Sequence, residues 1–324
     1  MLITALPKRV ERGRPRAGLT LIELMISVVL LGLMGSLIVG FLLKQGRFYA
    51  GANEILLTRT QVRQASVMMP SDLRGISAAG GDIYAMSDTM IEFRSTFGTS
   101  VICRNDRSTS QIPIPPVNLA KGSALSVWTQ TPTNNDSLAL YVDSTNASSV
   151  DDSWSYHKIT ATSIAFSNAT PGCTSASGLM KATGDVSSSN PSYSFTLSPQ
   201  QSATVTPGAA VRFFKKVHYS LYQASDGNWY LGYYDCRTSR TPVCNTIAPI
   251  AGPLKPYSST QPQLSGLRFT YYDTTGAVTA NRLAVSRISV LLQGQGTRTI
   301  QLAGGSPQTF SDSLRIEVAL RNRK

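Results

Sequence analysis

The first long hydrophobic pattern in the chain is a run that is apolar or small from Leu19 to Leu43. Its four exceptions are Thr20, Glu23, Ser27 and Ser36. A helix rises about 1.5 Å per residue, so a helical run of this length exceeds the ~30 Å hydrocarbon core of a bilayer. The pattern therefore predicts a transmembrane helix over residues 19–43, with a carboxylate near its start.

The pattern beyond the apolar run becomes amphipathic. Apolar residues recur at helical spacings of three, four or seven. They are Phe48, Ile55, Leu56, Val62, Ala65 and Met69. Pro70 and the pair Gly80-Gly81 are typical of a helix end. We therefore expect residues 44–80 to continue the helix as an amphipathic spine that packs on a globular head.

From about residue 81 onward the hydrophobic period changes from helical spacing to two. In LRIEVALR, residues 314–321, the apolar side chains alternate with polar ones, as in a half-buried strand. The pair Asp226-Gly227 separates two similar runs and favours a tight hairpin turn. Further strands are predicted at 217–223, 228–235, 267–273 and 283–294.

A long polar segment interrupts this β-rich region at about residues 123–207. It is rich in Ser, Thr, Asn and Pro, and strands are indicated only at 138–142 and 194–197. We interpret it as long loops and edge strands inserted into one head that spans 81–324. The predicted fold class is α+β, with a long N-terminal helix packed on an antiparallel sheet.

Charge is concentrated at the N-terminus. The chain has a formal net charge of +12, and a cluster of Lys and Arg precedes the apolar run within residues 1–18. By the positive-inside rule this segment stays in the cytoplasm and the head is exported to the periplasm. No later segment carries a dense Lys/Arg block with interleaved aromatic residues, so nucleic-acid binding is not expected.

The residues around the start of the apolar run resemble the class III signal of type IV pilins and pseudopilins. Gly18 precedes Leu19-Thr20-Leu21-Ile22, and Glu23 stands fifth after the glycine. The resemblance implies a type IV pilin-like fold, in which a prepilin peptidase cuts between Gly18 and Leu19 and removes the leader 1–18. It implies N-methylation of Leu19 by the same enzyme. It also implies that Glu23 pairs with the terminal amine of a neighbouring subunit during assembly.

A second resemblance lies near the C-terminus. Pro253-Leu254, then GLRFTYYD at 266–273 and Gly276, are similar to the larger minor pilins of the PilW type and to the J-type minor pseudopilin of type II secretion. The implied function is a minor pilin that initiates or tips a type IV pilus. The implied partners are other minor pilins, the major pilin, the inner-membrane assembly platform and membrane lipid. A pseudopilin of type II secretion, or a DNA- or surface-binding adhesin module at a pilus tip, remains an alternative.

Four cysteines, Cys103, Cys173, Cys236 and Cys244, follow the apolar run on the side predicted to be exported. Disulfides persist in an oxidising periplasm, and four cysteines allow three pairings. Loop closure favours the near pair Cys236–Cys244, which leaves Cys103–Cys173. The sequence thus predicts two disulfides.

Metal and catalytic sites are weakly indicated. A zinc site is the alternative use of the cysteines, but the chain has no C-x-x-C, and only His157 and His218 could assist. No G-x-S-x-G, H-E-x-x-H or P-loop pattern occurs, and Gly294-Gln-Gly296 is half of a dinucleotide fingerprint that we interpret as a loop after a strand. We expect no enzymatic activity and no cofactor.

Overall fold

A computed structural model of the protein describes residues 18, 20–119, 124–134, 136–143, 152–169, 171–174, 177–180, 184–236, 247–301 and 306–320. The chain divides into two compact units. The first comprises Met1–Asn53 with Ile300–Pro307, and the second comprises Glu54–Thr299 with Gln308–Lys324. The long helix α1 contributes residues to both units.

Helix α1, Leu21–Arg74, turns one buried stripe toward the sheet of the second unit. Its buried residues are Thr58, Val62, Ala65, Met69 and Leu73. They recur every three or four residues, which places them on one face of the helix. The predicted inward face is confirmed for Val62, Ala65 and Met69. It is wrong for Leu56, which lies off this stripe and is 62% exposed.

The helix ends six residues before the predicted boundary at residue 80, at Arg74. Pro70 lies inside the last turns of α1 and does not end the helix. The chain then turns back on itself, and the carboxylate of Asp82 accepts a hydrogen bond from the backbone N–H of Ser77 at 2.8 Å. Gly81 has φ of 75°, a conformation that glycine adopts without strain.

Thirteen described strands form one sheet. They are β1 (Ile83–Met86), β2 (Met90–Val101), β3 (Gln111–Ile114), β4 (Val127–Trp128), β5 (Ser137–Val142), β6 (Ser153–Ala165), β7 (Ser192–Ser198), β8 (Ala210–Gln223), β9 (Trp229–Asp235), β10 (Ile247–Leu254), β11 (Leu267–Tyr272), β12 (Arg287–Ile300) and β13 (Gln308–Ala319). A short 3₁₀ helix, Pro262–Leu264, precedes β11. The main path runs β11-β12-β10-β9-β8-β5-β6-β7-β3, while β13 pairs with β12, and β2 pairs with β1, β4 and β8. The fold is therefore an α+β fold of the predicted class, with one long helix packed on a large antiparallel sheet.

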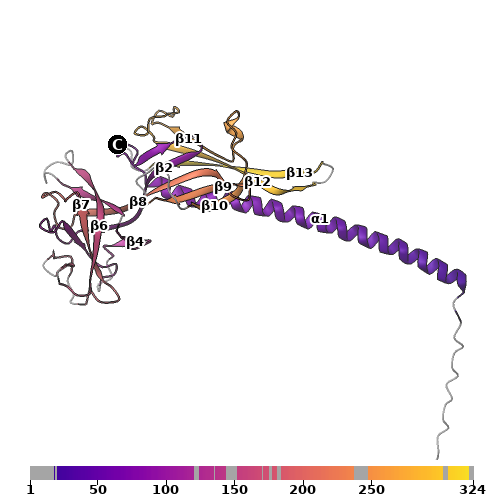
Figure 1. The fold of residues 1–324 in the computed structure, drawn as a ribbon, viewed down its shortest axis with the longest axis horizontal. Helices are drawn as coiled ribbons and strands as arrows, with labels where there is room; N and C mark the ends of the chain where they lie inside the picture. Colours follow the sequence, from indigo (N-terminus) through magenta and orange to yellow (C-terminus); the bar gives the residue numbers. More distant parts are fainter. Residues whose placement is uncertain are drawn as a thin grey trace, which may run out of the picture. The chain divides into compact units, whose positions relative to one another are not determined.

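The second unit contains two principal hydrophobic clusters. The helix-side cluster joins α1 to strands that include β2, β8, β11 and β12. Its members include Met69, Phe93, Tyr219, Phe269 and Val290. The insertion cluster includes Phe97, Ile112, Leu140, Phe195 and Phe213. Figure 1 shows β6 and β7 in magenta at one end of this unit and β12 and β13 in yellow at the other. Strands β2 and β8 contribute residues to both clusters, so the two cores share continuous strands.

The polar segment at 123–207 is thus more ordered than the sequence indicates. Strand β6 extends over thirteen residues, Ser153–Ala165, where no strand was predicted. Its Ser and Thr content hides the hydrophobic period, because Ile159 and Ala165 are the only buried apolar side chains along it. Backbone pairing with its neighbours holds β6 as a strand, since β6 lies between β5 and β7 and pairs with both.

A partly buried hydrogen bond ties the end of α1 to the sheet. The hydroxyl of Tyr219, on β8, donates to Asp72 Oδ2 at 2.7 Å. Burial raises the pKa of Tyr219, so the hydroxyl keeps its proton and remains a donor at physiological pH. The bond holds the C-terminal end of α1 against strand β8.

Two glycines of β12 allow α1 to approach the sheet closely. A Cβ atom at Gly294 would lie 2.6 Å from Val62 Cγ2 and 2.9 Å from Thr58 Cγ2, and one at Gly296 would lie 2.9 Å from Glu54 Oε1. The expectation that these glycines form a loop after a strand is wrong, because both lie within β12. Their small size serves helix-on-sheet packing.

We expect Gly294→Ala to destabilise the second unit. The added methyl group would displace Val62 and Thr58, and overpacking of this kind costs about 1–3 kcal/mol. Urea unfolding of the full chain, followed by tryptophan fluorescence, would measure the loss. Gly184→Ala is the matched control, since no atom in the described part of the chain lies within 4 Å of its Cβ position. Combining Gly294→Ala with Val62→Ala should recover part of the loss, and equal stability of Gly294→Ala and wild type would contradict the packing account.

Candidate functional site

The predicted processing site lies at the start of the described chain. Gly18 is exposed and lies outside any helix or strand, and no described residue lies within 4 Å of the position that a Cβ atom would take there. Leu19 and residues 1–17 lie outside the described residues. The protein's own described contacts therefore give no steric reason for a glycine at position 18.

Thr20 and Glu23 form a capping box at the start of α1. Glu23 Oε2 accepts hydrogen bonds from the backbone N–H of Thr20 at 2.9 Å and from its hydroxyl at 3.0 Å. The backbone N–H of Glu23 donates to Thr20 Oγ1 at 3.3 Å. Reciprocal bonds of this kind satisfy backbone donors that have no partner in the first helical turn. Glu23 thus has a local structural role as the residue that caps the helix.

The signal for this capping box was present in the sequence. Thr20 stands three residues before Glu23, directly ahead of an apolar run, which is the [ST]-x-x-[DE] pattern of a helix N-terminus. The resemblance implied a role for Glu23 in assembly alone, and the pairing of Glu23 with Thr20 was not predicted. Identifying both roles matters, because a substitution of Glu23 removes a cap and a charge together.

The helix after Glu23 presents apolar side chains in all directions. Within the described residues, one helix is long and apolar enough to cross a membrane, and the most apolar part of α1 has no buried residue. Leu21, Leu31 and Leu37 are each more than 70% exposed, and Phe48, expected on the inward face, is 71% exposed. A helix that is apolar all round requires an apolar surrounding such as lipid or neighbouring helices.

Glu23 lacks a cationic partner among the described residues. Its carboxylate is exposed and takes hydrogen bonds from Thr20 alone in that part of the chain. A carboxylate at bilayer depth costs roughly 2.5–3.5 kcal/mol even on lenient insertion scales. A positive group supplied from outside the described chain would offset this cost, so the site can receive an amine.

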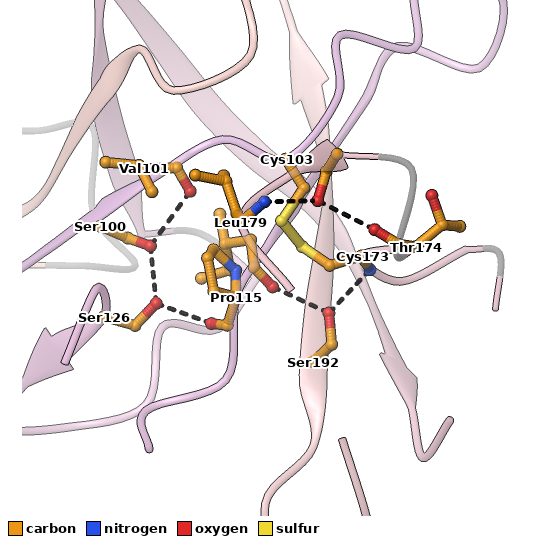
Figure 2. The surroundings of a disulfide bond; sticks show 11 residues. Ser100, Val101, Cys103, Pro115, Ser126, Cys173, Thr174, Leu179 and Ser192 are labelled. Carbon is orange, nitrogen blue, oxygen red and sulfur yellow. Dashed lines mark hydrogen bonds between the residues drawn. A yellow bond between two sulfur atoms is a disulfide. The ribbon is translucent and has the colours of Figure 1, made fainter. Parts of the chain in front are cut away.

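Within the described residues a disulfide joins Cys103 to Cys173 across a separation of 70 residues. Figure 2 shows its surroundings, where Ser192 Oγ accepts from the backbone N–H of Cys173 at 3.0 Å and donates to the carbonyl of Ile114 at 2.8 Å. A loop of this length gives about 4 kcal/mol of stabilisation in the chain-entropy model. The bond fastens the segment around Cys173 to Cys103, whose backbone N–H donates to the carbonyl of Pro113 on β3 at 2.8 Å.

The pairing predicted for the other two cysteines falls partly outside the described chain. Cys236 is buried at the end of β9 and is not a free thiol, whereas Cys244 lies outside the described residues. The Cys236–Cys244 bond therefore stays a prediction. Among the described residues, no group of three His, Cys, Asp or Glu side chains could hold a metal ion.

Both histidines lie on strands of the sheet, His157 on β6 and His218 on β8. The ring of His157 contacts the carbonyl of Pro199 through Nδ1 at 2.7 Å and the hydroxyl of Ser155 through Nε2 at 2.8 Å. His218 lies on β8 with its Nδ1 3.5 Å from Glu92 Oε2. Burial lowers the pKa of both imidazoles, so both are neutral at neutral pH.

Comparison with known proteins agrees with the N-terminal geometry. Residues 13–39 match the family model described as the prokaryotic N-terminal methylation motif. No curated protein and no solved structure gives a match to this chain. The motif, together with the apolar helix, supports a type IV pilin-like or pseudopilin-like protein that is processed by prepilin peptidase and fits a single-pass anchor in the inner membrane.

Proposed function

We propose that the protein is a minor pilin that assembles through its N-terminal helix and helps to initiate or tip a type IV pilus. The observation that carries the proposal is the methylation motif at residues 13–39, placed at the start of a helix that is apolar enough to cross a membrane. The C-terminal resemblance to the PilW type adds the minor-pilin assignment. The proposed role is structural, with no catalytic step.

Processing in this proposal occurs between Gly18 and Leu19. The prepilin peptidase removes residues 1–18 in the cytoplasm and methylates the new amine of Leu19. Exposure of Gly18, with no atom of the described residues near its Cβ position, supports access of the enzyme to an extended peptide. The head then lies in the periplasm, with α1 held in the inner membrane.

Assembly in this proposal uses Glu23 as the anion for the methylated amine of a neighbouring subunit. Support comes from the position of Glu23 in an exposed apolar segment and from the missing cation among the described residues. The capping bonds from Thr20 orient the carboxylate before the amine arrives. The partners are the other minor pilins, the major pilin and the assembly platform of the inner membrane.

The head favours a pilus over the short pseudopilus of type II secretion. Strands β3 to β7 build a second hydrophobic cluster beyond the helix-side cluster, so the insertion is a packed part of the head. A head of this size would crowd a thin fibre if it were repeated at every position. The protein should therefore occur in few copies, at or near the tip.

Deletion of the gene tests the proposal. Surface pili and twitching motility should be lost, while secretion of exoproteins continues. Cells that also lack pilus retraction should regain some pili, because initiation becomes slow and is not forbidden. Electron microscopy, a twitching assay and measurement of secreted protein provide the readouts, with the gene restored in trans as control. If deletion blocks exoprotein release and leaves pili normal, the proposal is wrong and the protein is instead a pseudopilin of type II secretion.

A further inference from the structure

The second unit carries a cavity of about 670 Å³ on its sheet. Residues of β2, β5, β6 and β8 form its floor, and the turn after α1, from Ser77 to Asp82, forms one wall. Its volume falls within the ~300–1,000 Å³ of ordinary ligand sites. No residue of the membrane-spanning segment lines it, so it is distinct from the assembly site.

The register of the strands creates the hollow. Arg212 on β8 pairs with Ala139 on β5, and Ala139 pairs in turn with Tyr156 on β6. Directly paired residues place their side chains on the same face of a sheet. The single methyl group of Ala139 therefore leaves space between a guanidinium and an aromatic ring. Tyr141 pairs with Trp154 in the same way and extends this face.

The aromatic residues of the cavity belong to none of the hydrophobic clusters of the described chain. Tyr141, Trp154 and Tyr156 lie outside the helix-side cluster, the insertion cluster and a third, smaller cluster around Cys103 and Cys173, and Tyr156 is 39% exposed. The rings of Tyr141 and Trp154 meet edge to face, with centroids 5.5 Å apart. Aromatic side chains that are rigidly held yet accessible are typical of a binding surface.

The charged groups of the cavity balance one another. Arg94 is closed off, because its Nη1 lies 3.1 Å from Asp82 Oδ1 and its guanidinium lies 3.9 Å from the ring centre of Tyr156. Arg212 lies over the ring of Trp154 at 4.9 Å. Among the described residues, no carboxylate lies within ion-pair distance of Arg212, so its N–H groups remain to bind a ligand.

The remaining carboxylate is Asp152, which accepts a hydrogen bond from the hydroxyl of Tyr141. The cavity lining thus contains two arginines and two aspartates, and their formal charges cancel although the chain carries +12. The carboxylate of Asp152 would repel an anionic ligand, and the guanidinium of Arg212 would repel a cationic one. The lining therefore favours an uncharged ligand that offers hydrogen-bond acceptors and donors together.

We propose that this cavity binds a neutral sugar unit of an oligosaccharide. A pyranose ring has an apolar C–H face that can pack against Trp154 and Tyr156. Its hydroxyl groups can accept hydrogen bonds from Arg212 and exchange others with Asp152 and Ser153. The inference stands apart from the proposed role in pilus assembly, since it uses only the head.

Saturation-transfer NMR on the full chain in lipid nanodiscs tests the inference, because nanodiscs avoid detergents with sugar headgroups. The neutral probes are chitotriose, cellotriose and N-acetyllactosamine, and the anionic probe is sialyllactose. At least one neutral probe should bind in the millimolar range or tighter. Binding of none of the neutral probes, or binding of sialyllactose alone, overturns the inference.

Two variants locate the binding. Trp154→Ala and Arg212→Ala should each weaken binding about tenfold or more, which corresponds to roughly 1.4 kcal/mol. Trp229→Phe is the matched control and should bind as wild type, since Trp229 lies on β9 and does not line the cavity. Circular dichroism checks folding, and Arg212→Ala alone decides the result if Trp154→Ala fails to fold. Unchanged binding in the folded variants overturns the inference.

Discussion

Replacing Gly18 with phenylalanine is expected to leave the protein as an uncut precursor in the inner membrane. A peptidase must bind the chain in an extended form around the bond between Gly18 and Leu19, and a bulky side chain beside that bond would obstruct it. Nothing in the described structure lies near the Cβ position of Gly18, so the folded head should be unaffected. Intact-mass spectrometry of the purified chain should find the leader still attached and no methyl group.

The control for this experiment is Gly32→Ala, within the apolar part of α1. No described atom lies within 4 Å of its Cβ position either, but it is far along the sequence from the proposed cut. We expect its mass to match the trimmed and methylated wild type. A wild-type chain that is never trimmed at Leu19, or a Gly18→Phe chain that is trimmed normally, would refute the proposed cleavage site.

Replacing Glu23 with glutamine is expected to allow cleavage and membrane insertion but to abolish assembly. The amide oxygen of glutamine can still accept from Thr20, so the helix cap is kept while the charge is lost. The methylated amine of a neighbouring subunit would then lack its anion at bilayer depth. An unpaired charge there costs roughly 2.5–3.5 kcal/mol, which is on the order of a hundredfold in an association constant. Co-purification of the other minor pilins and counts of surface pili would measure the loss.

Thr20→Val separates the same two roles of Glu23, helix capping and negative charge, in the opposite way. It removes the hydroxyl from the capping box and keeps the charge of Glu23, so assembly should remain close to wild type. Loss of an N-terminal cap costs about 0.5–2 kcal/mol of helix stability. If Thr20→Val abolishes piliation and Glu23→Gln does not, Glu23 acts as a cap and the amine–carboxylate pairing is wrong.

The long helix and strand β13 could be predicted from the sequence, because each has a regular hydrophobic period of its own. The alternation at Leu314, Ile316 and Val318 matches strand β13, and Leu320 directly follows the strand; these side chains are half-buried or buried, and the intervening ones are exposed. The α+β class followed from one helical period and several β periods. The cleavage and assembly residues rest on the N-terminal motif, and they stay predictions.

Features that depend on pairing between distant segments were not accessible from the sequence. Strand β6 is held by its neighbours and shows little alternation of its own. The role of Gly294 was predicted wrongly, because a glycine is needed there to make room for Val62, which lies more than two hundred residues earlier in the chain. The cavity joins Arg94, Arg212 and Trp154 from three strands, and none of these positions stands out in its own segment.

The two strands shared by both clusters make the insertion separable in evolution. Ser95 on β2 pairs with Lys215 on β8, and this pair lies between the helix-side residues Phe93 and Val217 and the insertion-cluster residues beyond it. The chain thus leaves and re-enters the pilin-like sheet at neighbouring points of one antiparallel ladder. Removing everything between those points would leave β2 and β8 as a plain hairpin with its register unchanged. A lineage could therefore acquire, exchange or discard this part of the head in a single event while the helix and its sheet stay intact.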